Sequence, residues 1–349
     1  MNSVFRISKT LLLAIAMTLT VDAAENNKVA TASGFAMIDI DGAQFSMSDL
    51  QRTDSAGLFQ ARNALYEAER KAADEFINKY VLDREAKKEN VSEDELLKRH
   101  AYNNIQEPSE EALHVYFDGI DTTEPYEAVR DKIRDTIRKR RMAKAKAAYV
   151  QLLRAHAKVT VRLAPPRAEV NANAPVRGAS PAAVKFVEFA DYECPYCQQI
   201  QPTVRRLEAE YKDRVAFAFK DLPLPMHQDA QKAAEATHCA EAQGKYWEYH
   251  DLLFATKQLA VADLKKHARS IGLNGEDFDK CLDSGAEAGR VKASLSEAQA
   301  IGLPGTPAFF VNGRFINGAV DYNTLRQVIE EELAANASAV ARVRDGGGQ

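Results

Sequence analysis

Two cysteines separated by two residues are the clearest chemical feature of the sequence. Cys194 and Cys197 enclose Pro195 and Tyr196, directly after an apolar run that predicts a strand and directly before a predicted helix. Free backbone N–H groups and the helix dipole stabilise an anion at the start of a helix, which lowers the pKa of the first thiol. The spacing therefore indicates thiol–disulfide exchange, with Cys194 as the exposed nucleophile and Cys197 as the more buried resolving cysteine. Proline at the first helical position suits its missing N–H and fixed φ.

The same cysteines could instead form half of a zinc site. Zinc needs four ligands, usually from a second such pair or from two histidines. His238-Cys239 is the one nearby candidate, and the 7 histidines show no ligand spacing. We therefore expect no metal, and no cofactor beyond a redox-active disulfide between Cys194 and Cys197.

The two remaining cysteines, Cys239 and Cys281, lie in helix-like segments with small or apolar neighbours. We predict a structural disulfide between them, which would stabilise the fold by roughly 3–4 kcal/mol in the chain-entropy model. The alternative is a pair of buried free thiols, since buried cysteine is common in cores.

Length and composition set the frame for this chemistry. A chain of 349 residues suggests two domains. The net charge is −4, with 46% hydrophobic and 28% charged residues. These values exclude a wholly disordered chain, a collagen-like chain and a polytopic membrane protein, and they give no general attraction to nucleic acid.

The N-terminus predicts a signal peptide. Arg6 and Lys9 precede the apolar run 11–21, which is about half the roughly 20 residues that a spanning helix needs. Small residues at Val21 and Ala23 suit a cleavage site, so residues 1–23 are expected to direct secretion into an oxidising compartment. The alternative is an uncleaved membrane anchor.

Residues 25–164 predict a mostly helical domain. A strand over 36–40 is followed by a helix over 56–88, two capped helices that open at Ser92 and Ser109, a helix over 124–157 and a strand over 158–163. Apolar residues recur at three and four along the first helix and predict one stripe that faces a core: Leu58, Ala61, Leu65, Ala68, Ala72, Phe76 and Tyr80. The helix over 124–157 is basic in its centre, which indicates either a solvated face paired with acids or a groove for acidic or unfolded clients.

A stretch rich in Pro, Ala, Gly and Asn, residues 165–182, marks a linker and edge segment. Beyond it, strands and helices alternate, which predicts an α/β domain over 183–336 with a mixed sheet. The expected elements are strands over 183–190 and 215–219, a helix over 195–211, a helical insert over 227–299, a hairpin around Asn312-Gly313, and a helix over 321–335. Residues 337–349 are expected to form a flexible tail.

The α/β half resembles DsbA-like thioredoxin-fold oxidoreductases over about residues 165–336. The resemblance rests on three segments in the same order, Phe186–Cys197, Gln243–His250 and Gly302–Phe309, with a helical insert that begins at His227. It implies a thioredoxin fold with a helical insertion, and it implies that Thr306, Pro307, Pro195 and Tyr196 shape the substrate site.

Several expectations follow from this resemblance alone. Pro307 matches the cis-proline that receives the substrate backbone, although only about 5–6% of X-Pro bonds are cis in general. Thr306 stands where isomerase-type members more often carry Thr and oxidase-type members more often carry Val. Tyr196 departs from the histidine of oxidase-type members, so the disulfide is expected to be less oxidising.

Glu188 stands in the predicted strand before Cys194, where this fold commonly keeps a buried acid. Burial raises the pKa of a carboxyl group, which would let Glu188 pass a proton to or from Cys197. The alternative is an acid at a strand end that reaches solvent.

The helical half more weakly resembles the N-terminal helical region of SurA-like periplasmic chaperones, in which the first and last segments pair and the helices bind clients. The parvulin isomerase module has no counterpart here, so no prolyl isomerase activity is expected. The helical half would hold clients near Cys194 or serve as a dimerisation arm.

Together these patterns predict a periplasmic thiol:disulfide oxidoreductase that forms or reshuffles disulfides in unfolded secreted proteins. Its expected partners are cysteine-containing secreted proteins and a membrane thiol redox partner, with no nucleic acid and with homodimerisation through the helical half. The alternatives are a holdase chaperone and a dedicated thiol reductase for one client.

Overall fold

The computed structural model describes residues 36–41, 43–47, 49–50, 54–171 and 173–346. The predicted signal peptide, residues 1–23, lies outside this range. The chain forms two compact units, Met1–Ser55 and Ala56–Gln349. The predicted linker at 165–182 therefore lies within the second unit, because helices from before and after it pack on the same sheet.

The first unit contains a short hairpin. Strand β1 (Ala36–Ile40) pairs antiparallel with β2 (Ala43–Ser46). The sequence predicted β1 but not β2. Strand formation was also expected over 158–163, and that prediction is wrong: residues 158–166 belong to no strand. An alternating pattern becomes a strand only where a neighbouring backbone supplies hydrogen bonds, and β1 has that neighbour in β2.

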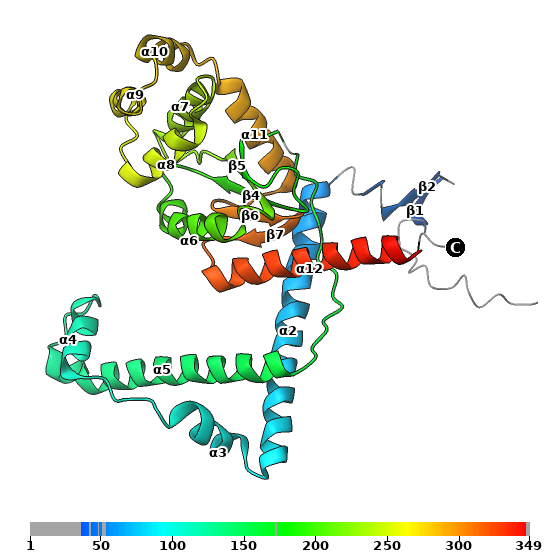
Figure 1. Ribbon diagram of the computed structural model, residues 1–349, viewed down its shortest axis with the longest axis vertical. Helices are drawn as coiled ribbons and strands as arrows, with labels where there is room; N and C mark the ends of the chain where they lie inside the picture. Colours follow the sequence, from blue (N-terminus) through cyan, green and yellow to red (C-terminus); the bar gives the residue numbers. More distant parts are fainter. Residues whose placement is uncertain (1–35, 42, 48, 51–53, 172, 347–349) are drawn as a thin grey trace, which may run out of the picture. The chain divides into compact units, whose positions relative to one another are not determined.

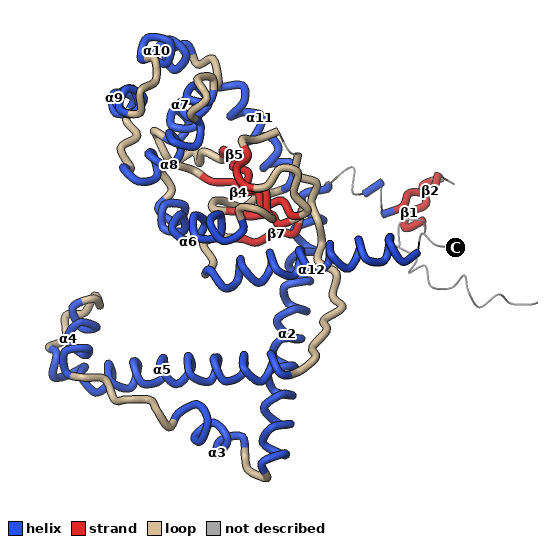
Figure 2. The backbone as a smooth tube through the Cα atoms, in the orientation of Figure 1, coloured by secondary structure: helices blue, strands red, loops and turns tan. Residues whose placement is uncertain are grey.

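The second unit is built around a five-stranded mixed sheet in the order β3-β5-β4-β6-β7 (Figures 1 and 2). Its strands are β3 (Val176–Gly178), β4 (Val184–Ala190), β5 (Val215–Asp221), β6 (Ala308–Val311) and β7 (Arg314–Asn317). The central β4 runs parallel to β5 and antiparallel to β6. Asn312 and Gly313 both have positive φ, as the predicted type I′ turn between β6 and β7 requires.

Helices cover both faces of this sheet. Helices α6 (Pro195–Tyr211) and α12 (Tyr322–Gly346) bury an apolar cluster against one face that includes Phe186, Leu207, Phe309 and Leu325. The other face packs on α11 (Ala288–Ile301) and on Phe59 of α2 (Ser55–Glu89). Helix α12 continues through the segment expected to be a flexible tail, because the sequence from 337 to 346 has no Pro or Gly before its end.

The helical insert lies between β5 and β6. It comprises α7 (Ala230–Glu241), α8 (Tyr246–Thr256), α9 (Val261–Ser270), α10 (Gly275–Ser284) and α11. These helices enclose the largest buried cluster of the described residues, which extends to Tyr192 and to both Cys194 and Cys197. The insert and the cysteine pair therefore share one core.

The preceding helices are α2, α3 (Glu93–Leu97), the π-helix η2 (Lys98–Tyr102), α4 (Glu110–Asp118) and α5 (Tyr126–His156). Ser92 and Ser109 cap α3 and α4, as their spacing predicted. Small cores join the C-terminal part of α2 to α3 and α5 through Leu82, Leu96 and Val150, and join α4 to α5 around Leu113.

The apolar stripe of α2 does not face a core, so that prediction is wrong. Leu65, Phe76 and Tyr80 are 60%, 71% and 57% exposed. The helix instead buries Tyr66, Val81, Leu82 and Ala86, which lie on other sides of it. Helix α2 packs against one core near its start and against a different core near its end. These two cores lie on different sides of the helix, so one continuous apolar stripe cannot face both.

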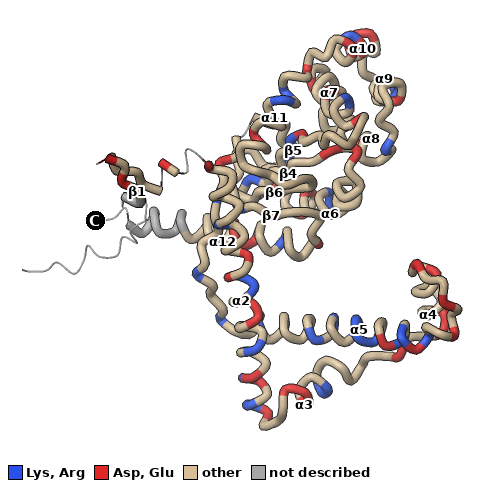
Figure 3. Tube along the Cα trace, turned by 180° about the vertical axis from the view of Figure 1, so that it is seen from behind, with Lys and Arg blue, Asp and Glu red and all other residues tan. Residues whose placement is uncertain are grey.

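The basic centre of α5, where Lys and Arg residues are drawn in blue in Figure 3, is partly paired with acidic side chains. Arg130, Arg134, Arg138 and Lys146 form ion pairs with glutamates of α3, of α4 and of the segment before α4. This arrangement matches the solvated-face interpretation of the charge run. Within the described residues, no helix combines the length and the apolar character needed to cross a membrane.

Candidate active site

The cysteine pair lies where β4 gives way to α6. Cys194 is the N-cap residue of α6 and Pro195 occupies its first turn. Cys197 is fully buried, whereas Tyr196 is exposed. Cys194 was expected to be exposed, but it is only 2% accessible. The loop that contains Thr306 covers it: the carbonyl oxygen of Thr306 lies 3.7 Å from Sγ of Cys194.

The two thiols, both free in this structure, have opposite acidities. A hydrogen bond from Cys197, helped by backbone N–H groups of Cys197 and Tyr196, lowers the pKa of Cys194 to about 5. Burial raises the pKa of Cys197, and the hydrogen bond to Cys194 and the charge of Glu188 raise it further. At neutral pH the pair therefore holds a thiolate on Cys194 and a proton on Cys197.

The loop before β6 forms the opposite wall of the site. The Thr306–Pro307 peptide bond is cis. The hydroxyl of Thr306 is buried beside the cysteine pair, and the Thr306 side chain lowers the pKa of both thiols. The structure thus brings Thr306 and Pro307, which are far away in the sequence, against Cys194.

Glu188 lies on the central strand β4 and is 3% exposed. Gln201 of α6 donates a hydrogen bond of 2.9 Å from Nε2 to its Oε1. Burial, with a smaller contribution from the charge of Glu208, raises the pKa of Glu188 to about 8. The carboxyl group is therefore protonated at neutral pH.

A group of charges on the same side of the sheet surrounds Glu188. Arg177 of β3 forms ion pairs with Glu208 at 2.8 Å and with Asp251 at 3.0 Å, and its guanidinium lies over the ring of Trp247. Glu188 and Glu208 line the same small cavity. The Arg177 charge opposes the rise in the pKa of Glu188. No local spacing links residues 177, 208 and 251, so the sequence alone did not predict this group.

The described residues contain no group of three or more His, Cys, Asp or Glu side chains that could hold a metal ion. Residues 171–331 match the family model described as Thioredoxin. This part of the chain has a thioredoxin-like fold. The predicted resemblance to DsbA-like proteins of this fold is confirmed for this domain.

Curated relatives align with about half of this chain. The chain is similar to Na(+)/H(+) antiporter NhaA 3 of Salinispora tropica, with 40% identity over 176 residues, or 50% of this chain and 26% of that protein. The chain spans about a quarter of the length of the curated relatives it matches.

Among solved structures, the chain is similar to BdbD of Bacillus subtilis, with 25% identity, a TM-score of 0.44, and coverage of 46% of this chain and 93% of that one. It is also similar to the thiol-disulfide exchange protein alpha-DsbA2 of Wolbachia pipientis, with 23% identity, a TM-score of 0.43, and coverage of 46% and 88%.

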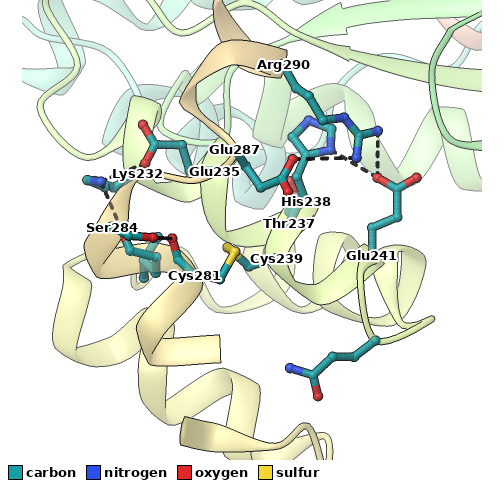
Figure 4. Close-up of a disulfide and its surroundings, with 12 residues drawn as sticks. Lys232, Glu235, Thr237, His238, Cys239, Glu241, Cys281, Ser284, Glu287 and Arg290 are labelled. Carbon is teal, nitrogen blue, oxygen red and sulfur yellow. Dashed lines mark hydrogen bonds and ion pairs between the residues drawn. A yellow bond between two sulfur atoms is a disulfide. The ribbon is translucent and has the colours of Figure 1, made fainter. Parts of the chain in front are cut away.

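The thioredoxin domain carries a second pair of cysteines, well apart in the sequence. Cys239 of α7 and Cys281 of α10 form a disulfide with a Cα–Cα distance of 5.9 Å (Figure 4). Lys232 of α7 also links these helices, because its Nζ donates a hydrogen bond of 3.2 Å to the carbonyl oxygen of Leu282 in α10. The structure thus joins the two cysteines that the sequence analysis paired.

One histidine beside the cysteine loop was not predicted from the sequence to belong to the site. His227, which the sequence indicated only as the start of the insert, forms an ion pair of 2.7 Å with Asp191, at the end of the loop that carries Cys194. Asp191 lies within Phe186–Cys197, one of the segments that carry the DsbA-like resemblance, so the sequence did indicate that Asp191 is near the site. Nothing in the sequence indicated that His227 is its partner.

Proposed function

We propose that this protein is a thiol:disulfide oxidoreductase that forms or reshuffles disulfides in unfolded secreted proteins. The observation that carries the proposal is the arrangement of Cys194 at the N-terminus of α6, hydrogen-bonded to Cys197 and facing the Thr306–Pro307 loop. The acidic first thiol and the protonated second thiol are the two states that disulfide exchange requires.

In the oxidising direction, a client thiolate attacks Sγ of Cys194 in the disulfide form. The Cys194–Cys197 bond breaks, and Cys197 leaves as a thiolate that takes the proton of Glu188. A second client thiolate then attacks the client sulfur of the mixed disulfide and releases Cys194 as a thiolate. Two electrons pass from the client to the cysteine pair, and the reaction needs no other cofactor.

In the reshuffling direction, the Cys194 thiolate attacks a client disulfide and releases one client thiolate. Another client thiolate then resolves the mixed disulfide, with no net electron transfer. Two residues favour this direction. Tyr196 brings no positive charge to the exposed position beside Cys194, and Thr306 provides a hydroxyl where oxidase-type members more often carry Val.

We place the protein in the periplasm, on the basis of the predicted signal peptide and the disulfide between Cys239 and Cys281, which an oxidising compartment favours. The partners would be cysteine-containing secreted proteins and a membrane thiol redox protein that resets the pair.

A holdase function is the second candidate, and one observation favours it. The exposed apolar face of α2, formed by Leu65, Phe76 and Tyr80, is the kind of surface that binds unfolded segments. We propose that this face holds clients for the cysteine pair. Dimerisation through the same face is the competing use.

The test is equilibration of the full-length protein in glutathione buffers, with Cys194→Ser as the inactive variant and a Cys239→Ser/Cys281→Ser double variant as the matched control. We expect the wild type and the control to exchange with glutathione and to refold a scrambled disulfide protein, and Cys194→Ser to do neither. Full biological and refolding activity in Cys194→Ser would overturn the enzyme function and leave the holdase function.

A further inference from the structure

Asp191 connects the cysteine loop to the loop that follows β5. Its Oδ1 accepts a hydrogen bond of 2.7 Å from the N–H of Glu193, and its Oδ2 accepts one of 2.8 Å from the N–H of Leu224. Its carbonyl oxygen accepts a bond of 3.2 Å from the N–H of Cys194. The fully buried carboxylate therefore fixes the position of both loops.

His227 is held by the same carboxylate. Its Nδ1 lies 2.7 Å from Oδ2 of Asp191, and its side chain is largely covered. Glu193 of the cysteine loop also contacts the segment that follows His227, because its Oε2 accepts a hydrogen bond of 2.8 Å from the N–H of Asp229. The imidazole is thus fixed two hydrogen bonds away from the backbone of Cys194.

We propose that His227 is a positioning residue that places an imidazolium charge near the Cys194 thiolate and thereby tunes the reactivity of the cysteine pair. This inference rests on the proposed function. Tyr196 provides no positive charge between the two cysteines. His227, in the loop after β5, provides a positive charge in its place. The expected result is a more stable thiolate and a more oxidising disulfide than the tyrosine alone would give.

The surrounding charges agree with this role. Asp191 and Glu193 on the cysteine loop and Cys194 at the start of α6 are the charged groups that face His227, and each raises its pKa against the opposing effect of burial. The attraction between two titrating groups is reciprocal, so the charge of His227 lowers the pKa of Cys194 by the same interaction energy. The largest cause of the low pKa of Cys194 remains its hydrogen bond from Cys197.

The experiment measures the thiolate absorbance of Cys194 against pH, and the equilibrium constant with glutathione, in the full-length protein. His227→Gln keeps a donor for Asp191 but removes the charge. We expect the pKa of Cys194 to rise by roughly half a unit to one unit. The glutathione equilibrium should shift about three- to tenfold towards the disulfide form of the protein, because a less stable Cys194 thiolate makes the disulfide less oxidising and one pKa unit corresponds to a factor of ten.

Two further variants separate charge from structure. His227→Lys restores a positive charge and should return both quantities towards wild type. His114→Gln, the same change at an exposed histidine of α4, should leave both unchanged. The glutathione equilibrium constants of the wild type and His227→Gln should become equal at alkaline pH, where the imidazole is neutral. The difference between them should also become smaller at high salt, which screens the charge.

An unchanged pKa of Cys194 in His227→Gln, or a His227→Lys variant that behaves like His227→Gln, would overturn the inference. Failure of the proposed function looks different. In that case the wild type itself would show no acidic thiol and no equilibrium with glutathione, whatever the variants do.

Discussion

Gln201 donates a hydrogen bond of 2.9 Å to Glu188 and so joins the active-site helix to the central strand behind it. Both side chains are buried, and Oε1 of Gln201 has no partner among the described residues. The bond fixes the carboxyl group on the side of the sheet that α6 covers. The helix that carries Cys197 therefore sets the position of the Glu188 carboxyl group, for which we propose a role in proton transfer.

The raised pKa of Glu188 predicts a loss of stability with rising pH. Between the ordinary value of 4.5 and the folded value of about 8, the folded state holds a proton that the unfolded state has lost. The free energy of unfolding of the wild type should therefore fall across this range relative to Glu188→Gln. Denaturant unfolding at pH 5 and pH 8 measures this, and parallel pH profiles of the two proteins would contradict it.

Arg177 should be more important for stability than its position at the sheet edge suggests. Arg177→Met leaves Glu208 unpaired and removes a charge that lowers the pKa of Glu188. We expect a loss of about 2 kcal/mol, below the 3–5 kcal/mol of a fully buried pair because Arg177 reaches solvent. Adding Glu208→Gln should restore part of the loss, and a double-mutant cycle with no coupling energy would argue against the pair.

The disulfide between α7 and α10 should stabilise the insert without taking part in exchange. The Cys239→Ser/Cys281→Ser variant should lose about 3–4 kcal/mol of unfolding free energy, the value expected for a loop closed over 42 positions. Its glutathione equilibrium, measured without denaturant, should match the wild type. Peptide mapping under non-reducing conditions that found both thiols free would contradict the pairing.

The exposed face of α2 gives a prediction that separates holding from catalysis. Replacing Leu65, Phe76 and Tyr80 by Ser, Gln and Gln should change stability by no more than about 0.5 kcal/mol, because these side chains are exposed. Protection of an unfolded client against aggregation should fall, while the redox potential stays unchanged. Size-exclusion chromatography is the control: a wild-type dimer that becomes a monomer in the variant would assign the face to self-association.

The sequence by itself determined the features that depend on local order. The strand–helix junction places Cys194 at an N-terminus, Ser92 and Ser109 begin their helices, and Asn312-Gly313 makes its turn, because each of these depends on residues a few positions apart. The resemblance to DsbA-like proteins extended this to the position of Thr306 and Pro307.

Only the tertiary structure decided the features that depend on distant contacts. Cys194 is covered because a loop more than a hundred residues away lies over it, and His227 reaches Asp191 because β4 and β5 end side by side. The apolar stripe of α2 is exposed because other sides of this helix pack against two separate cores. Periodicity specifies which side chains share a face, but which face meets a core depends on packing partners that lie elsewhere in the chain.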